Sequence, residues 1–126
     1  MSNSLICLLP DRSKWEEICA DPKKIDNAVS EVVRHSSPQT SWRRIAKEDT
    51  QIGGVKIPKG THVFLSLASA NHDEALFSDP GTFDIARDNA SRNISFGRGI
   101  HFCLGARLAQ TEVKIAIEIL AEKLPS

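Results

Sequence analysis

The most constraining feature of the sequence is a cysteine at the point where a glycine-rich loop runs into a long helix. Apolar residues recur with helical spacing from about Leu104 to Leu124, directly after the run Phe96-Gly97-Arg98-Gly99-Ile100-His101-Phe102-Cys103-Leu104-Gly105. At about 100° per residue they cover an arc of roughly 200°, which indicates burial against more than one neighbour. The N-terminus of such a helix offers unpaired N–H groups and a positive dipole end, which favour a thiolate at Cys103.

The glycines around this cysteine set its surroundings. Gly97 and Gly99 permit tight or left-handed backbone turns, so the loop can fold closely around the sulfur. Gly105 has no side chain, so a flat ligand can approach the helix. The alternative is that Cys103 is an inert, buried small residue, which is the usual state of a free cysteine.

Size and charge exclude several classes of protein. A chain of 126 residues suffices for one domain with one modest core. Sixteen basic residues balance sixteen acidic ones, so neither nucleic acid nor an anionic membrane is expected as a partner. An odd, low cysteine count (Cys7, Cys19 and Cys103) indicates a reducing, cytoplasmic setting. No apolar run approaches the roughly 18 residues that a membrane span needs.

The chain divides into three zones. The first, Leu5 to His35, is expected to be helical, with a start signal at Asp21-Pro22 and an end at Ser36-Ser37-Pro38. One apolar stripe is formed there by Ile25, Ala28, Val29, Val32 and Val33.

The second zone, Gln39 to Ala70, is expected to hold short strands and turns. Gly53-Gly54 indicates a turn between Thr50–Ile52 and Val55–Ile57, and the run from Thr61 to Leu67 suggests a partly buried strand. The third zone begins at Asn71, with a short helix expected over Asp73–Phe77. The stretch from Ser78 to Gly99 is predicted to be irregular. The fold class is therefore α+β and helix-rich, with a small β-sheet between the second and third zones.

The cysteine loop resembles the haem-ligand signature of the cytochrome P450 family, in the form of its bacterial, soluble members. All the defined positions of that signature match, from Phe96 and Gly97 through His101 and Cys103 to Gly105. The resemblance implies that Cys103 is the thiolate ligand of the iron of haem b. Thiolate ligation pushes electron density onto the metal and favours O–O cleavage.

Glu31 and Arg34 form a second constellation. They are three residues apart, so they face nearly the same way on the predicted helix, opposite its apolar stripe. Taken alone they indicate an exposed ion pair worth less than about 1 kcal/mol. In the family, however, Glu-x-x-Arg is buried and joined by a further arginine, for which Arg87 is the candidate. The resemblance implies a structural network that holds the cysteine loop.

The resemblance also implies ligands for the haem propionates. His101 lies two residues before Cys103, where bacterial relatives place a propionate-binding histidine, and Arg44 opens a segment that resembles the one that supplies an arginine. A guanidinium suits a carboxylate well. His101 and Arg44 could each equally be a solvated surface group, and the adjacent Arg43 could serve in place of Arg44.

Rival sites have less support. His101 and Cys103 could bind zinc, but no second Cys/His pair stands at zinc spacing. The glycine-rich loop lacks the Gly-Lys-Ser/Thr ending of a phosphate loop. Nothing beyond the presence of the residue types supports a Ser-His-Asp triad.

The resemblance runs from about Ser13 to Leu124, although full-length members are several times longer. We therefore expect one partial domain over residues 1–126, the C-terminal part of a cytochrome P450 domain with its distal half absent and apolar surface exposed. The resemblance implies a monooxygenase that inserts oxygen into a small organic substrate and takes electrons from a ferredoxin or a reductase. No residue here matches the family's distal acid–alcohol pair. A truncated non-catalytic haem-binding fragment, a gene remnant and a structural module that never loads haem remain alternatives.

Overall fold

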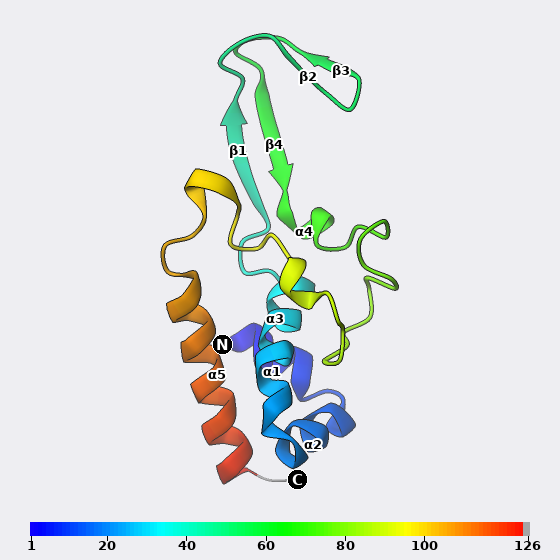
Figure 1. Ribbon diagram of the computed structural model, residues 1–126, viewed down its shortest axis with the longest axis vertical. Coiled ribbons are helices and arrows are strands. Elements are labelled where there is room, and N and C mark those ends of the chain that lie inside the picture. Colours follow the sequence, from blue (N-terminus) through cyan, green and yellow to red (C-terminus); the bar gives the residue numbers. More distant parts are fainter. Residues whose placement is uncertain (125–126) are drawn as a thin grey trace.

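The computed structural model describes residues 1–124 and has helices at one end and strands at the other (Figure 1). The helical elements are α1 (Ser2–Leu8), α2 (Arg12–Ala20), η1 (Pro22–Lys24), α3 (Ile25–His35), α4 (Leu67–Ala70), η2 (Ala90–Arg92), η3 (Gly99–His101) and α5 (Ala106–Lys123). The strands are β1 (Ser41–Ile45), β2 (Thr50–Ile52), β3 (Val55–Ile57) and β4 (His62–Ser66). This confirms the mixed, helix-rich class. None of the helices in residues 1–124 combines the length and the hydropathy needed to cross a membrane.

Two aspartates start the first helical elements. The Asp11 carboxylate accepts a hydrogen bond from the Ser13 N–H at the start of α2, and Asp21 accepts one from the Lys23 N–H at the start of η1. Hydrogen bonds from Lys14 and Ser13 lower the pKa of Asp11 to about 2. Side-chain capping of this kind satisfies N–H groups that have no partner within the helix.

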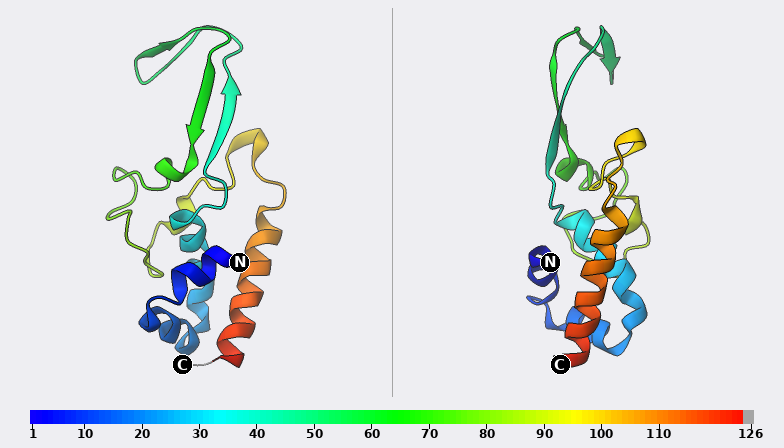
Figure 2. Two further views of the ribbon diagram at one scale, coloured as in Figure 1. Left: turned by 180° about the vertical axis from the view of Figure 1, so that it is seen from behind. Right: turned by 90° about the vertical axis from the view of Figure 1, so that its left-hand side faces the viewer.

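The core lies among the helices at one end of the molecule (Figure 2), where α3 packs against α5 and α1, and α2 packs against α5. The apolar stripe of α3 supplies Ile25, Ala28 and Val29, and α5 supplies Ile117. Trp15 of α2 is buried and its indole Nε1 donates to the Leu124 carbonyl at 3.1 Å, which ties α2 to the end of α5. Much of α5 is nevertheless uncovered, because Leu108, Ile115 and Ile119 are exposed along it. The expectation of exposed apolar surface is confirmed.

The strands form two antiparallel pairs, β1 with β4 and β2 with β3. In the first pair Trp42 lies opposite Leu65 and Arg44 opposite Val63. Both pairs lie within the second zone, so the expectation of a sheet between the second and third zones was wrong. In the irregular part of the third zone, several backbone carbonyls accept from arginine and asparagine side chains and others close turns, instead of pairing in a strand.

The short helix expected over Asp73–Phe77 is also absent. The Asp73 carboxylate accepts from the Ala75 N–H, and the Asp73 carbonyl accepts from the Leu76 and Phe77 N–H groups, so the segment closes as turns. Asp11 makes the same kind of bond at the start of α2, but no helix continues from Asp73, because the Leu76 carbonyl accepts from Asn89 Nδ2 and Pro80, four residues after Leu76, has no N–H. The predicted helix from Leu104 begins instead at Ala106, while the stretch from Ser78 to Gly99 is irregular apart from η2 and η3, as expected.

Candidate functional site

The cysteine loop is closed by backbone hydrogen bonds. The Cys103 N–H donates to the Phe96 carbonyl at 2.9 Å, and the Phe102 N–H donates to the Gly99 carbonyl at 3.0 Å. Gly97 and Gly99 have φ values of 74° and 69°, in the left-handed region that favours glycine. The loop thus needs glycine at both positions and presents Cys103 shortly before α5 begins.

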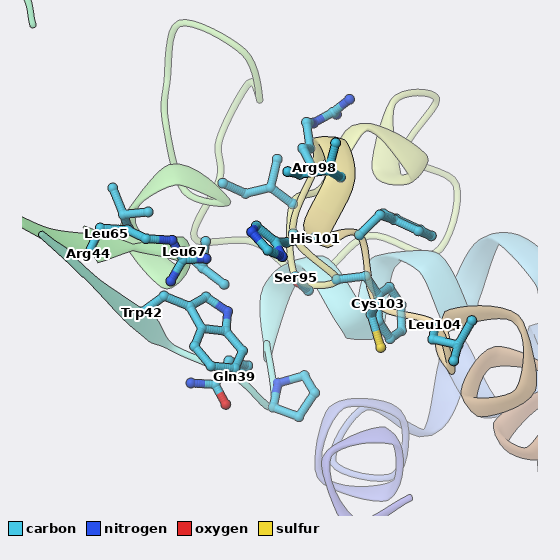
Figure 3. A pocket seen from close by; sticks show the side chains of 16 residues that line it. Gln39, Trp42, Arg44, Leu65, Leu67, Ser95, Arg98, His101, Cys103 and Leu104 are labelled. Carbon is cyan, nitrogen blue, oxygen red and sulfur yellow. The ribbon is translucent and has the colours of Figure 1, made fainter. Parts of the chain in front are cut away.

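A hollow of about 1040 Å³ lies between this loop and the strands β1 and β4. Cys103 is exposed and lines it. Figure 3 shows Trp42 and Arg44 on the strand side, facing His101 and Cys103 on the loop side. The other lining residues are Pro38, Gln39, Leu65, Leu67, Ile94, Ser95, Phe96, Gly97, Arg98, Ile100, Phe102 and Leu104. The walls are therefore largely apolar, with one sulfur and a few cationic or polar groups.

The two residues that are candidates for binding a carboxylate lie on opposite sides of the hollow. His101 belongs to η3 and Arg44 to β1, and both line it, whereas Arg43 does not. Side chains alternate along a strand, so Arg43 points to the other face of the β1–β4 sheet. Of the two adjacent arginines, the structure thus brings Arg44 together with His101 and Cys103. Phe96 and Gly97 line the hollow too, while Gly105 precedes α5 with open space where a Cβ would stand.

Glu31 and Arg34 are both completely buried. Arg34 Nε donates to Glu31 Oε2 and Arg34 Nη2 to Glu31 Oε1, each at 2.7 Å, which makes a two-pronged ion pair. The remaining donors of Arg34 reach the carbonyls of Asn71 (2.8 Å), Pro80 (2.9 Å) and Thr82 (3.2 Å). Glu31 and Arg34 lie on the side of α3 opposite its apolar stripe, as the helical spacing predicts. They are nevertheless buried, because the irregular stretch of the third zone covers that side of α3.

Arg87 joins the pair. Its Nε donates to Glu31 Oε1 at 3.1 Å, and its other nitrogens donate to the carbonyls of Ser78, Asp79 and Thr82. Within residues 1–124 every buried side-chain nitrogen or oxygen has a hydrogen-bond partner. A buried ionic network is tolerable only when it is satisfied in this way.

The charge state of Glu31 follows from its surroundings. Burial raises its pKa, but hydrogen bonds from Arg34, the Asp84 N–H and Arg87, together with the charge of Arg34, outweigh burial and hold the pKa below the ordinary 4.5. Glu31 is therefore ionised at neutral pH.

Two residues that the sequence analysis missed connect α3 to the cysteine loop. Asn71 and Ser95 are both buried, and Asn71 Nδ2 donates to Ser95 Oγ at 2.7 Å. Ser95 Oγ donates to the Val33 carbonyl at 2.6 Å, and Asn71 Oδ1 accepts from the Ile94 N–H at 2.8 Å. Residues 94–95, which lead into the loop at Phe96, are thereby fixed to α3. Asn71 and Ser95 belong to no periodic pattern in the sequence, so nothing there indicated that they connect α3 to the cysteine loop.

The site thus combines an exposed cysteine sulfur with largely apolar walls and with arginine and histidine side chains that can bind an anionic group. No group of three or more His, Cys, Asp or Glu side chains in residues 1–124 is placed to hold a metal ion by itself. Cys103 can contribute one ligand to a metal carried by a cofactor.

Comparisons with known proteins identify relatives of this chain. The Cytochrome P450 family model matches residues 23–123. The chain is 41% identical over its whole length to the biotin biosynthesis cytochrome P450 of Bacillus subtilis, of which it covers 32%. It is 39% identical over 98% of its length to linalool 8-monooxygenase of Pseudomonas putida, of which it covers 30%.

Solved structures extend this likeness to the fold. The crystal structure of the Tepidiphilus thermophilus P450 heme domain matches 98% of this chain with a TM-score of 0.93 and 45% identity, and the chain covers 30% of it. This chain belongs to the cytochrome P450 family, whose members bind haem. It spans about a third of the length of the relatives that it matches.

Proposed function

We propose that this chain forms the haem-binding part of a cytochrome P450 monooxygenase, as a single partial domain over residues 1–126, with Cys103 as the ligand of the iron of haem b. One observation carries the proposal. An exposed cysteine sulfur lines a largely apolar hollow of about 1040 Å³, with a guanidinium and an imidazole lining the same space.

The residues present fit this cofactor. The volume of the hollow slightly exceeds the about 300–1000 Å³ typical of ligand pockets. Trp42, Leu65 and Phe96 would contact the apolar ring, while Arg44 and His101 would donate to the propionate carboxylates. Gly97 allows the turn that forms the cysteine loop, since its φ of 74° suits a residue without a Cβ.

Bound haem would supply oxygen activation, with insertion of one oxygen atom into an organic substrate. The protein groups would hold and tune it. Cys103 would provide the sulfur ligand, and the Glu31–Arg34–Arg87 network fixes the irregular stretch that leads to the loop. Asn71 and Ser95 hold residues 94–95 against α3, so the position of the sulfur depends on rigid elements.

We propose an electron-transfer protein, a ferredoxin or a reductase, as a partner of the whole enzyme. Beside the cysteine loop a second groove of about 540 Å³ is lined by Ser30, Phe102, Arg107 and Lys114, among others. The Lys114 ammonium is already paired, since its Nζ lies 2.8 Å from Asp26. The exposed Arg107 is therefore the better candidate for contacting an acidic partner.

Three free cysteines support a reducing, cytoplasmic setting.

The test is a carbon monoxide spectrum. The purified chain is loaded with haem, reduced and exposed to carbon monoxide, and a strongly red-shifted carbonyl band is expected. The band should disappear in Cys103→Ser and persist in the control Cys19→Ser, whose sulfur lies on α2 and contacts the Ala121 carbonyl. A band that survives Cys103→Ser, or no haem uptake at all, would refute the proposal.

The chief alternative is a haem-binding chain without turnover. In the described residues the walls of the hollow come from the cysteine loop and the residues before it, from the β1–β4 sheet and from the adjoining Pro38, Gln39 and Leu67, and Leu104 on its wall is exposed. Turnover with an electron donor and a test substrate distinguishes the two. A chain that gives the red-shifted band but consumes no substrate is the non-catalytic form.

A further inference from the structure

Trp42 is unusually placed for a tryptophan. It is 47% exposed, whereas Trp15, the other tryptophan, is 5% exposed and packed in the core. Trp42 lies on β1 directly opposite Leu65 of β4, and both line the hollow. A large aromatic group left open on a cavity wall usually meets a ligand.

Arg44 is the neighbour of Trp42 on the same face of β1, because residues two apart along a strand point the same way. The Arg44 guanidinium carbon lies 6.0 Å from the centre of the Trp42 ring. This is within the range at which a cation is attracted to the face of an indole.

Arg44 has few other restraints. The hydrogen bond found for its side chain is from Nη1 to the neighbouring Arg43 carbonyl, at 2.8 Å, and it forms no ion pair within residues 1–124. Its other donors remain available. A long side chain of this kind loses rotamer freedom when it binds a ligand, so a group that restricts it beforehand increases affinity.

We propose that Trp42 is a positioning residue, which holds the Arg44 guanidinium toward the hollow so that it can bind a carboxylate of the cofactor. The inference rests on the proposed haem site. The proposed role of Trp42 depends on the carboxylates of the cofactor and not on its apolar ring. A cofactor with the same ring but without free carboxylates therefore tests it.

The test compares haem with its dimethyl ester, which has the same ring but no free carboxylates. Both are titrated by absorbance into the wild-type chain and the variants Trp42→Phe and Trp42→Leu. The loss of an exposed cation–aromatic contact corresponds to a dissociation constant about two- to fivefold larger. We expect this increase in the dissociation constant of haem for Trp42→Leu and a smaller increase for Trp42→Phe. The dissociation constant of the ester should differ less between the wild type and the two variants.

A matched control and a double variant complete the design. Phe64→Leu also replaces an exposed aromatic residue by leucine, but on β4 opposite Arg43, on the other face of the sheet, and it should leave both affinities unchanged. In an Arg44→Gln background, Trp42→Leu should no longer weaken haem relative to the ester. Circular dichroism checks that each variant is folded.

Equal weakening of haem and ester by Trp42→Leu would overturn the inference, because Trp42 would then be an apolar wall alone. Unchanged haem affinity in Trp42→Leu would also overturn it. In both cases the wild-type chain still binds haem through Cys103, so the proposed function stands. A wild-type chain that binds neither compound would refute the proposed function and this inference together.

Discussion

Replacing Arg34 by methionine should destabilise the fold more than any surface substitution. The guanidinium is fully buried between Glu31 and the carbonyls of Asn71, Pro80 and Thr82, and it lies 5.2 Å from the centre of the Phe77 ring. The variant would leave the Glu31 carboxylate buried with Arg87 as its one remaining cationic partner in residues 1–124.

Removing one partner of a buried ion pair lowers the free energy of unfolding by about 3–5 kcal/mol. Small domains have about 5–15 kcal/mol in total, so much of the stability should be lost. With a urea dependence of about 2 kcal/mol per molar, the unfolding midpoint should fall by about 1.5–2.5 M. Urea unfolding followed by tryptophan fluorescence measures the shift, because Trp15 is buried in the folded state.

The matched control is Lys114→Met. Lys114 also lies 2.8 Å from a carboxylate, that of Asp26, but the pair is exposed, so its loss should cost about 0.2–1 kcal/mol. If Arg34→Met lowers the free energy of unfolding by no more than the control does, the network does not hold the fold as argued.

Three further perturbations are informative. The pKa of Glu31 in the folded chain lies below its ordinary 4.5, so the ionised carboxylate contributes fully to stability above pH 4.5, and this contribution is lost as the pH falls from 4.5 through the folded pKa. Glu31→Gln should therefore flatten the acid part of the stability–pH profile measured by urea unfolding. An unchanged profile would argue against this role of Glu31. Ser95→Ala should cost about 1–3 kcal/mol, measured by urea unfolding, because Asn71 Nδ2 loses its partner, while the exposed Ser91→Ala should be neutral. Gly97→Ala, at a φ of 74°, should cost about 1–2 kcal/mol and weaken haem binding in an absorbance titration; a neutral result would mean that the loop relaxes.

Local signals predicted the elements whose causes are local. The Asp21-Pro22 start signal, the Gly53-Gly54 turn and the apolar periodicity of α3 and α5 depend on residues close in sequence, and the structure has helices and a hairpin there. The helix predicted over Asp73–Phe77 does not form, because the Leu76 carbonyl accepts from the side chain of Asn89, 13 residues away, and composition alone did not reveal this contact.

Long-range features could not be read from periodicity. Glu31 and Arg34 lie opposite the apolar stripe of α3, which would normally mean solvent, and only the family resemblance indicated burial. The covering segment is itself irregular, so no pattern marks its path. The choice between Arg43 and Arg44 similarly depends on the alternation of β1, a strand whose limits the sequence did not define. The roles assigned to Cys103 and to the carboxylate ligands remain predictions.

The partners of the two buried arginines are mostly main-chain oxygens, those of residues 71, 78, 79, 80 and 82. Every amino acid carries such an oxygen, so this part of the polypeptide can exchange many of its side chains while remaining anchored. Inserting or deleting a single residue is different, because it shifts the whole row of oxygens out of reach. Natural variation here should therefore preserve the number of residues more strictly than their identity.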